Sequence, residues 1–302
     1  MRTTLQTILG LELPIIHAPM AGAQGSGLTI AVSNAGGLGS LPCAALNLTQ
    51  VREELETIKA QTNRPFNVNF FCHTSPTPNP ERETAWRSAL LPYYQEFKID
   101  ITTIPSGPGR LPFTAEAADL LSKFEPPIVS FHFGLPSQEL LGKVRAWGAK
   151  IISSATTLEE GIWLEAPGVD AIIAPGLEAG GHRGHFLSPD LTLHSSTFTL
   201  LSNLVRAVKV PVIAAGGIAD AKGVKEALAQ GADAVQIGTA YLCCPETATS
   251  PLLRAALTST RQTALTTLFT GRPARGIMNR LMLELGHNNV LAPEFPLATA
   301  DL

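Results

Sequence analysis

The chain has 302 residues, of which 45% are hydrophobic and 16% are charged, and 25 acidic against 22 basic residues give a formal net charge of −3. This composition excludes a disordered chain and a coiled coil, because both need more charge. No basic run exceeds two residues, which argues against a nucleic-acid partner and an anionic membrane surface.

The cysteine pattern gives no sign of a metal or disulfide framework. Cys43, Cys72, Cys243 and Cys244 form no CxxC pair, which fits a reducing compartment. The N-terminal stretch MRTTLQTILGLELP lacks the apolar core and cleavage site of a signal peptide. No apolar stretch reaches the roughly 18 residues that a membrane span needs. We therefore expect a cytoplasmic protein without a membrane segment.

Eight short apolar runs recur along the chain, at 13–19, 36–41, 66–71, 127–133, 149–155, 170–176, 210–217 and 233–239. Near-continuous apolar runs are typical of parallel strands that are buried on both faces. Helix-like segments separate most of these runs, at 49–61, 137–148, 156–166 and 220–231. Eight alternating strand and helix units predict an α/β fold, the (β/α)8 TIM barrel, with an open doubly wound sheet as the alternative.

Two segments depart from this rhythm. Residues 72–126 separate the third run from the fourth, and we interpret them as an inserted, partly helical excursion. Residues 245–302 follow the last run, and we interpret them as a C-terminal helical extension that ends in a surface arm. The barrel itself is then expected over residues 1–71 and 127–244.

Glycines follow the last two predicted strands. In TIM barrels the active site lies at the carboxyl ends of the strands, and phosphate often binds after strands seven and eight. Gly216 and Gly217 follow the seventh run, and Gly238 and Thr239 end the eighth. Their backbone N–H groups can approach an anion closely, and Asp220 is expected to cap the next helix. The two loops predict a phosphate cradle, although a Gly-Gly pair can also simply turn the chain.

Polar and soft side chains end two other runs. Asn69 ends the third run, and a buried amide there needs hydrogen-bond partners. The edge of a flavin ring would supply such partners, and so would neighbouring backbone. Met20 follows Pro19 after the first run and could pack on a planar ring, although filling core space is the commoner role of methionine.

His132 is the leading catalytic candidate. It ends the fourth run between Phe131 and Phe133, and an imidazole can exchange protons near neutral pH. The alternative is a histidine buried in the core. His182 and His185 are spaced as HxxH, but the surrounding glycines argue against the helix that would direct both to one metal. We therefore predict no metal site and expect His182 to line a ligand cleft.

Taken together, these residues resemble the nitronate monooxygenase family, formerly called 2-nitropropane dioxygenases. The similar stretches run in order from residue 13 to residue 280: HAPMAG (17–22), VSNAGGLGSL (32–41), NVNFF (67–71), SFHFGLP (130–136), DAIIAPGLEAGGHRG (170–184), PVIAAGGIAD (211–220), GADAVQIGTAY (231–241) and GRPARGIMN (271–279). The resemblance implies a barrel that binds FMN non-covalently. It also implies oxidation of alkyl nitronates by O2 to a carbonyl compound and nitrite, with neutral nitroalkanes as further candidate substrates.

The resemblance also implies roles for individual residues. The expected FMN contacts are Pro19, Met20, Asn69, Gly176, Gly180, Gly181, Gly216, Gly217, Gln236, Ile237, Gly238 and Thr239. His132 matches the catalytic histidine of the family. An apolar wall for a short alkyl chain would come from Phe131, Phe133 and Met20. Relatives often carry glutamine where this chain has Pro175, so we expect altered flavin tuning rather than lost flavin binding.

Three other functions stay open at this point. An FMN-dependent reductase on the same fold could pass electrons from NAD(P)H to a quinone or an enoyl thioester, although no second nucleotide fingerprint is visible. A flavin-free barrel of the purine-nucleotide dehydrogenase type would need a cysteine after the sixth strand, and residues 174–189 contain none. A flavin carrier would bind FMN without turnover. The sequence sets neither the physiological substrate nor the oligomeric state, although a homodimer is compatible with it.

Overall fold

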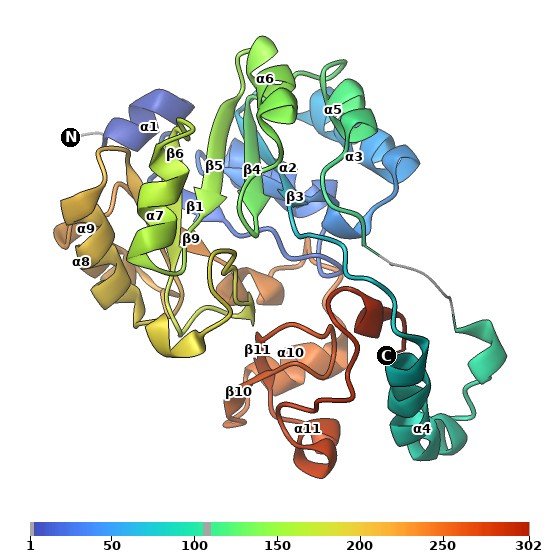
Figure 1. The fold of residues 1–302 in the computed structure, drawn as a ribbon. Coiled ribbons are helices and arrows are strands. Elements are labelled where there is room, and N and C mark those ends of the chain that lie inside the picture. Colours follow the sequence, from blue (N-terminus) through green and yellow to red (C-terminus); the bar gives the residue numbers. More distant parts are fainter. Residues whose placement is uncertain (1–2, 105–109, 302) are drawn as a thin grey trace. The chain divides into compact units, whose positions relative to one another are not determined.

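The structure, a computed structural model, describes residues 3–104 and 110–301. Within these residues the main sheet has eight parallel strands in the order β1-β9-β8-β6-β5-β4-β3-β2 (Figure 1). They are β1 (Ile15–His17), β2 (Gly39–Pro42), β3 (Phe66–Phe71), β4 (Ile128–His132), β5 (Lys150–Ser154), β6 (Ala171–Pro175), β8 (Val212–Ala215) and β9 (Ala234–Ile237).

Backbone hydrogen bonds between β1 and Leu38, the residue before β2, nearly close the sheet. His17 N donates to Leu38 O, and Leu38 N donates to Ile15 O, both at 2.9 Å. Every predicted run overlaps one of the eight strands, so the predicted TIM barrel is confirmed and the open sheet is wrong.

Helices surround the sheet and connect most of its strands. In the barrel they are α1 (Thr4–Leu9), α2 (Ser26–Asn34), α3 (Leu48–Gln61), α5 (Ala115–Leu121), α6 (Gln138–Ala146), α7 (Leu158–Glu165), α8 (Thr197–Ala207) and α9 (Ala221–Ala229). Side-chain caps explain where several begin: Asp220 Oδ1, as expected, accepts from Gly223 N at 2.8 Å. Across the part of the chain described here, no helix combines the length and apolarity needed to cross a membrane.

The pleat of each strand separates two apolar layers. Buried side chains inside the barrel pack together with α1 and belong to Leu5, Leu9, Leu11, Ile16, Leu38, Ile128, Ile152, Ala171, Ile173, Ile213, Ala215 and Ala234. The opposite faces of the strands pack on the helices, as Val68 and Phe70 do. Because side chains of α1 and this apolar filling occupy one end of the barrel interior, polar side chains that face inward gather toward the other end.

The chain forms two compact units. The barrel unit contains the described part of residues 1–73 together with 112–179 and 184–254. The second unit contains 180–183 and the described parts of 74–111 and 255–302. The barrel unit therefore resumes at residue 112, whereas the predicted excursion over 72–126 placed its return at residue 127. The reason is Phe113, whose ring lies 5.0 Å from that of Phe70 and 5.2 Å from that of Phe131. Residues 105–109 of the excursion lie outside the described residues.

The C-terminal boundary also differs from the predicted one at residue 245. The Arg254 guanidinium donates to Cys244 O at 2.7 Å and to Thr247 Oγ1 at 2.9 Å. These bonds tie the segment up to residue 254 to the barrel unit, so α10 (Pro251–Leu257) crosses the boundary between the units.

The second unit has its own small sheet and core. Its sheet orders β10 (Thr263–Thr266), β11 (Ala274–Ile277) and β7 (Gly181–His182), and its helices include α4 (Pro80–Phe97) and α11 (Arg280–Leu285). The buried side chains of this core belong to Trp86, Leu90, Tyr94, Leu268, Met282 and Ala292.

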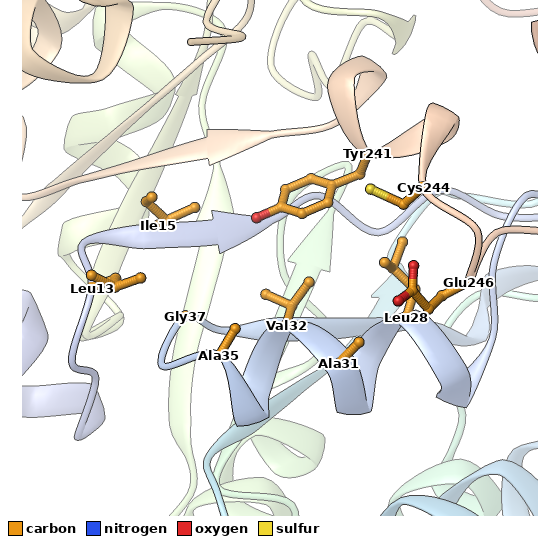
Figure 2. A pocket seen from close by; sticks show the side chains of 10 residues that line it. All are labelled: Leu13, Ile15, Leu28, Ala31, Val32, Ala35, Gly37, Tyr241, Cys244 and Glu246. Atoms are coloured by element: carbon orange, nitrogen blue, oxygen red, sulfur yellow. The ribbon is translucent and has the colours of Figure 1, made fainter. Parts of the chain in front are cut away.

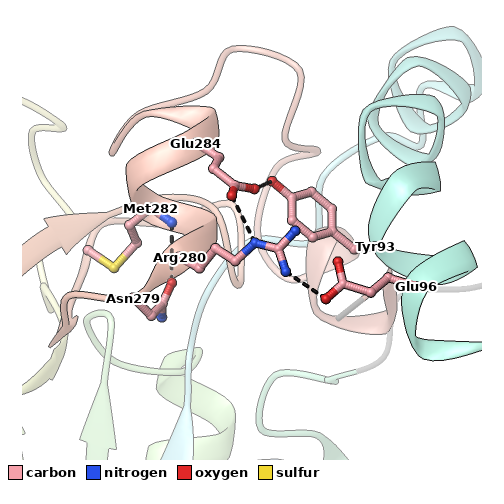
Figure 3. A network of polar contacts seen from close by, with 6 residues as sticks. All are labelled: Tyr93, Glu96, Asn279, Arg280, Met282 and Glu284. Carbon is pink, nitrogen blue, oxygen red and sulfur yellow. Dashed lines mark hydrogen bonds and ion pairs between the residues drawn. The ribbon is translucent and has the colours of Figure 1, made fainter.

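A polar network joins α4 to α11 (Figure 3). The Arg280 guanidinium donates to Glu96 at 2.7 Å and to Glu284 at 2.8 Å, and the Tyr93 hydroxyl donates to Glu284 at 2.6 Å. The hydrogen bond from Arg280 lowers the pKa of Glu96, and those from Tyr93 and Arg280 lower the pKa of Glu284. Both carboxylates are therefore held in their charged form.

Strand β9 is followed in the barrel unit by the short η4 (Thr239–Cys243). A cavity of about 200 Å³ lies between α2 and this segment (Figure 2). Its mostly apolar lining consists of Leu13, Ile15, Leu28, Ala31, Val32, Ala35, Gly37, Tyr241, Cys244 and Glu246. Because Ile16 faces the barrel interior, its neighbour Ile15 places this cavity on the outer face of the barrel.

Candidate active site

Toward their carboxyl ends, the strands turn polar on their inner face. Val68 and Phe70 belong to the helix-facing layer, so the alternation directs Asn69 into the barrel. The same alternation directs four further side chains at strand ends inward: His132, Ser154, Pro175 and Gln236. We call this carboxyl-terminal end of the barrel the mouth.

Two amides at the mouth share one serine. Asn67 Nδ2 donates to Ser130 Oγ at 2.9 Å and to Ser40 Oγ at 3.0 Å. Asn69 Nδ2 donates to Ser130 Oγ at 3.0 Å and to Ser130 O at 3.3 Å. Protein groups thus satisfy the amide nitrogen of Asn69, for which the sequence left a flavin edge and backbone as equal alternatives.

Gln236 presents an unsatisfied acceptor at the mouth. Within the described residues, its buried Oε1 has no hydrogen-bond partner. Burying an unpaired carbonyl oxygen is unfavourable, and such groups are rare in folded proteins. Gln236 lies opposite Ala215 of the neighbouring strand. Ala215 is directly followed in the chain by Gly216 and Gly217. A ligand that donates an N–H here would satisfy this oxygen.

His132 lies at the end of β4 in a polar and aromatic setting. Its Nδ1 is 2.7 Å from Ser154 Oγ, and its ring centroid lies 5.8 Å from that of Phe71 and 4.4 Å from that of Phe133. Phe133 has a φ of 69° and Gly134 a φ of 88°, so the chain leaves the strand through a left-handed turn. A phenylalanine in this conformation is strained, and such strain clusters at functional sites.

Two predicted site residues face away from the mouth. Phe131 is 1% exposed, and its ring packs on that of Phe113, so it belongs to the helix-facing layer and does not line the site. The side chain of Ile237 lies in the same layer, which leaves only its backbone for a cofactor contact. The Phe131 expectation failed because consecutive residues of a strand point to opposite faces, whereas a backbone contact from Ile237 stays a prediction. Phe133, by contrast, lies beside His132.

Backbone conformation and close packing explain why the two residues after β8 are glycines. Gly216 and Gly217 adopt φ values of 104° and 70°, which side-chain-bearing residues rarely adopt. A β-carbon on Gly216 would lie 2.6 Å from Ala179 N, and one on Gly217 would lie 3.2 Å from Glu178 Cβ. Gly217 is nevertheless exposed, as is Thr239 after β9, so both loops can be reached by a ligand.

The remaining predicted cofactor contacts in the barrel unit lie in different loops. A β-carbon on Gly176 would collide with the backbone of Thr197, so close packing on α8 accounts for this glycine without a cofactor. Pro19 and Met20 are half-buried in the loop after β1, and Gly238 is the residue directly before η4. Since β1 pairs with β9, these two loops start from neighbouring strands.

Gly180, Gly181 and His182 belong to the second unit. His182 lies in β7, with its Nε2 2.9 Å from Thr270 Oγ1 and its ring centroid 5.2 Å from that of Phe295. Arg183, which follows, is fully buried in the same unit. Among the residues that the structure describes, no group of three or more His, Cys, Asp or Glu side chains could hold a metal ion.

Sequence reasoning missed three polar residues of the mouth: Asn67, Ser130 and Ser154. A signal was present, because each interrupts an otherwise apolar run that reads as a buried strand. What the sequence did not contain was the identity of the partner that each side chain meets on the neighbouring strand.

Comparisons with known proteins agree with this geometry. A model of the nitronate monooxygenase family matches residues 2–301. A protein named nitronate monooxygenase from Paraburkholderia phytofirmans is 41% identical over 287 residues, which cover 92% of this chain and 77% of that protein.

Solved structures show the same similarity. Nitroalkane oxidase from Streptomyces ansochromogenes superposes with a TM-score of 0.88 at 34% identity, covering 98% of this chain and 84% of that chain. FabK from Thermotoga maritima superposes with a TM-score of 0.72 at 27% identity, covering 94% of this chain and 77% of that chain.

Proposed function

We propose that this chain, which belongs to the nitronate monooxygenase family of oxidoreductases, uses FMN and O2 to oxidise alkyl nitronates to a carbonyl compound and nitrite. One observation carries the proposal. A histidine, an amide with an unsatisfied buried oxygen and two glycine loops meet at the mouth of a single barrel.

The residues at the mouth fit a flavin mononucleotide. The ring edge of a flavin carries an N–H that would satisfy Gln236 Oε1. The exposed loops after β8 and β9 offer backbone N–H groups and the Thr239 hydroxyl to a phosphate. We therefore assign Gly216, Gly217, Gly238 and Thr239 to the phosphate and Met20, Asn69 and Gln236 to the ring. Contacts from Pro19, Gly180 and Gly181 stay predictions from the family resemblance.

A bound flavin would supply the electron acceptor that amino-acid side chains lack. The protein contributes the substrate site, in which His132 is the group that touches the nitro function. A neutral imidazole can donate a hydrogen bond to a nitronate oxygen or take the α-proton of a neutral nitroalkane. A nitronate is already a carbanion equivalent and needs no deprotonation. Phe71 and Phe133 flank the imidazole and give the substrate's alkyl chain an apolar surface.

The test is the composition and turnover of the purified protein. We expect denaturation to release one FMN per chain, and we expect the holoenzyme to consume O2 and form nitrite from a preformed alkyl nitronate. Release of FAD, or a protein that does not bind added FMN, would contradict the cofactor assignment. Flavin reduction by NAD(P)H without O2, combined with no nitrite from any nitronate, would favour the reductase alternative.

A further inference from the structure

We propose that Ser154 and Gly184 are positioning residues that hold one edge of the His132 imidazole and thereby fix the orientation in which the ring meets the substrate. The inference rests on the proposed function, in which His132 touches the nitro group. All three residues belong to the barrel unit.

Ser154 approaches His132 from the neighbouring strand. β4 and β5 pair in parallel with Phe131 opposite Ser153, so the next residues along, His132 and Ser154, lie side by side at the mouth. Ser154 Oγ is 2.7 Å from His132 Nδ1, and Ser154 is only 3% exposed. A buried hydrogen bond of this length competes little with water, so it restricts the imidazole to one orientation.

The Ser154 hydroxyl can stay hydrogen-bonded to His132 while the imidazole gains or loses a proton. The Ser154 hydroxyl can donate to a bare Nδ1 and can accept from a protonated one. The bond therefore persists in both neutral tautomers and in the imidazolium. A carboxylate at the same place would favour the charged ring. Ser154 thus fixes the direction of His132 without fixing its charge, so the ring can take part either as a hydrogen-bond donor to a nitronate or as a base toward a nitroalkane.

Gly184 limits the same edge of the ring from the other side. A β-carbon there would lie 2.5 Å from His132 Cε1, 3.1 Å from His132 Nδ1 and 3.0 Å from Ser154 Oγ. Real β-carbons essentially never approach another atom closer than 3.0 Å. The φ of Gly184 lies outside the left-handed region, so its backbone does not require glycine. The space taken by His132 and Ser154 is what explains this glycine.

A buried carboxylate fixes the loop that carries Gly184. Glu160 is 1% exposed, and its Oε1 accepts from Phe186 N at 2.6 Å and from Leu187 N at 3.2 Å. Its Oε2 accepts from Thr156 N at 2.7 Å at the start of α7. Because the barrel holds the loop this firmly, Gly184 is a fixed wall against the imidazole.

The first test compares Ser154→Ala with Ser154→Thr. Loss of the hydroxyl should lower kcat/KM about tenfold, mostly in kcat, and Ser154→Thr should stay within about threefold of the wild type. A purely structural role for Ser154 would lower the thermal stability of Ser154→Ala and leave the kcat of the folded variant unchanged.

The second test concerns the space beside the ring. Gly184→Ala should lower kcat/KM at least about tenfold, because the new β-carbon displaces His132. Gly142→Ala is the matched control, since a β-carbon on this helical glycine meets nothing within 4 Å and should leave kcat/KM unchanged. Thermal unfolding and the flavin spectrum establish that each variant is folded.

A readout without turnover separates this proposal from the proposed function. Nitrogen NMR of isotope-labelled histidine reports the ring state of His132, whose signal is assigned by its absence in His132→Asn. The Nδ1 shift should change in Ser154→Ala and Gly184→Ala but not in Gly142→Ala. A wild type that oxidises no nitronate contradicts the function and leaves this readout valid. Unchanged shifts in folded Ser154→Ala and Gly184→Ala overturn the positioning role, as does a Ser154→Thr variant as impaired as Ser154→Ala.

Discussion

Met20 lies directly against Gly238, because a β-carbon on this glycine would be 3.5 Å from Met20 Sδ and 3.3 Å from Ala18 Cβ. The contact joins the loops that follow β1 and β9, and these strands pair with His17 opposite Ile237. Residues assigned to the flavin ring and to its phosphate thus share one edge of the mouth, although more than 200 positions separate them in the chain. Ring and phosphate contacts can be tested one at a time.

The phosphate assignment predicts that Gly217→Asp abolishes FMN binding. The carboxylate would lie where the phosphate is expected and would repel it. Gly217→Asn is the matched control, because asparagine has nearly the same size, carries no charge and tolerates the φ of 70° better than most residues. Binding is measured by titration of the apoprotein with FMN. Equal loss of binding in both folded variants would mean that strain, and not charge, is responsible.

The inward direction of Pro175 predicts that this residue tunes the flavin. Ile173 faces the barrel interior and Ala174 the helices, so Pro175 faces the mouth. Pro175→Gln adds an amide there and should shift the flavin absorbance or reduction potential while the barrel stays folded. Ala174→Gly alters the helix-facing neighbour and should leave the flavin signal unchanged. A folded Pro175→Gln variant with the wild-type spectrum and potential would place this residue away from the cofactor.

The two roles of His132 can be separated with His132→Asn, which keeps a hydrogen-bond donor but removes the base. Oxidation of a preformed nitronate should stay within about tenfold of the wild type, because it needs no deprotonation. Turnover of the neutral nitroalkane should fall by roughly 10²–10⁴-fold, as is typical when a general base is lost. Both substrates are assayed at one pH, before the nitronate is reprotonated.

Equal losses on both substrates would show that His132 orients or polarises the nitro group without acting as a base. No loss on either substrate would return His132 to the interpretation as a core histidine. Thermal unfolding of His132→Asn distinguishes these outcomes from a damaged barrel.

His17 predicts a loss of stability in mild acid. The side chain is fully buried, and this burial lowers its pKa from 6.5 to about 4. Between these two pH values, His17 is therefore protonated in the unfolded chain and neutral in the folded chain. The free energy of unfolding should fall as the pH drops from about 6.5 to about 4, by up to about 3 kcal/mol from this group.

His17→Gln removes this titration, so its stability should depend less on pH than that of the wild type. Urea unfolding of both proteins across this pH range measures the difference, and any general cost of the substitution appears equally at every pH. Parallel curves for the two proteins would show that His17 does not resist protonation.

The strands were readable from sequence because each is buried on both faces and therefore forms a near-continuous apolar run, as 210–217 does around β8. The same continuity hides which face is inward, and Phe131 was assigned to the site for that reason. The bond between His132 and Ser154 joins residues 22 positions apart on different strands, and no local pattern encodes such a partner. Likewise, no local pattern assigns α5 to the barrel instead of the excursion. The ring contacts of Phe113, which lies just before α5, make that assignment.

Ser130 determines which atoms the mouth offers to a ligand. It takes both donor directions of the Asn69 amide nitrogen, which leaves the oxygen as the atom that this side chain can offer a ligand. Gln236 adds a second carbonyl oxygen at the same end of the barrel. Two acceptors at one end of the barrel can discriminate between isosteric molecules. A lactam inhibitor, which donates an N–H, should bind more tightly than the matching lactone, whose ring oxygen would meet these carbonyls with its lone pairs.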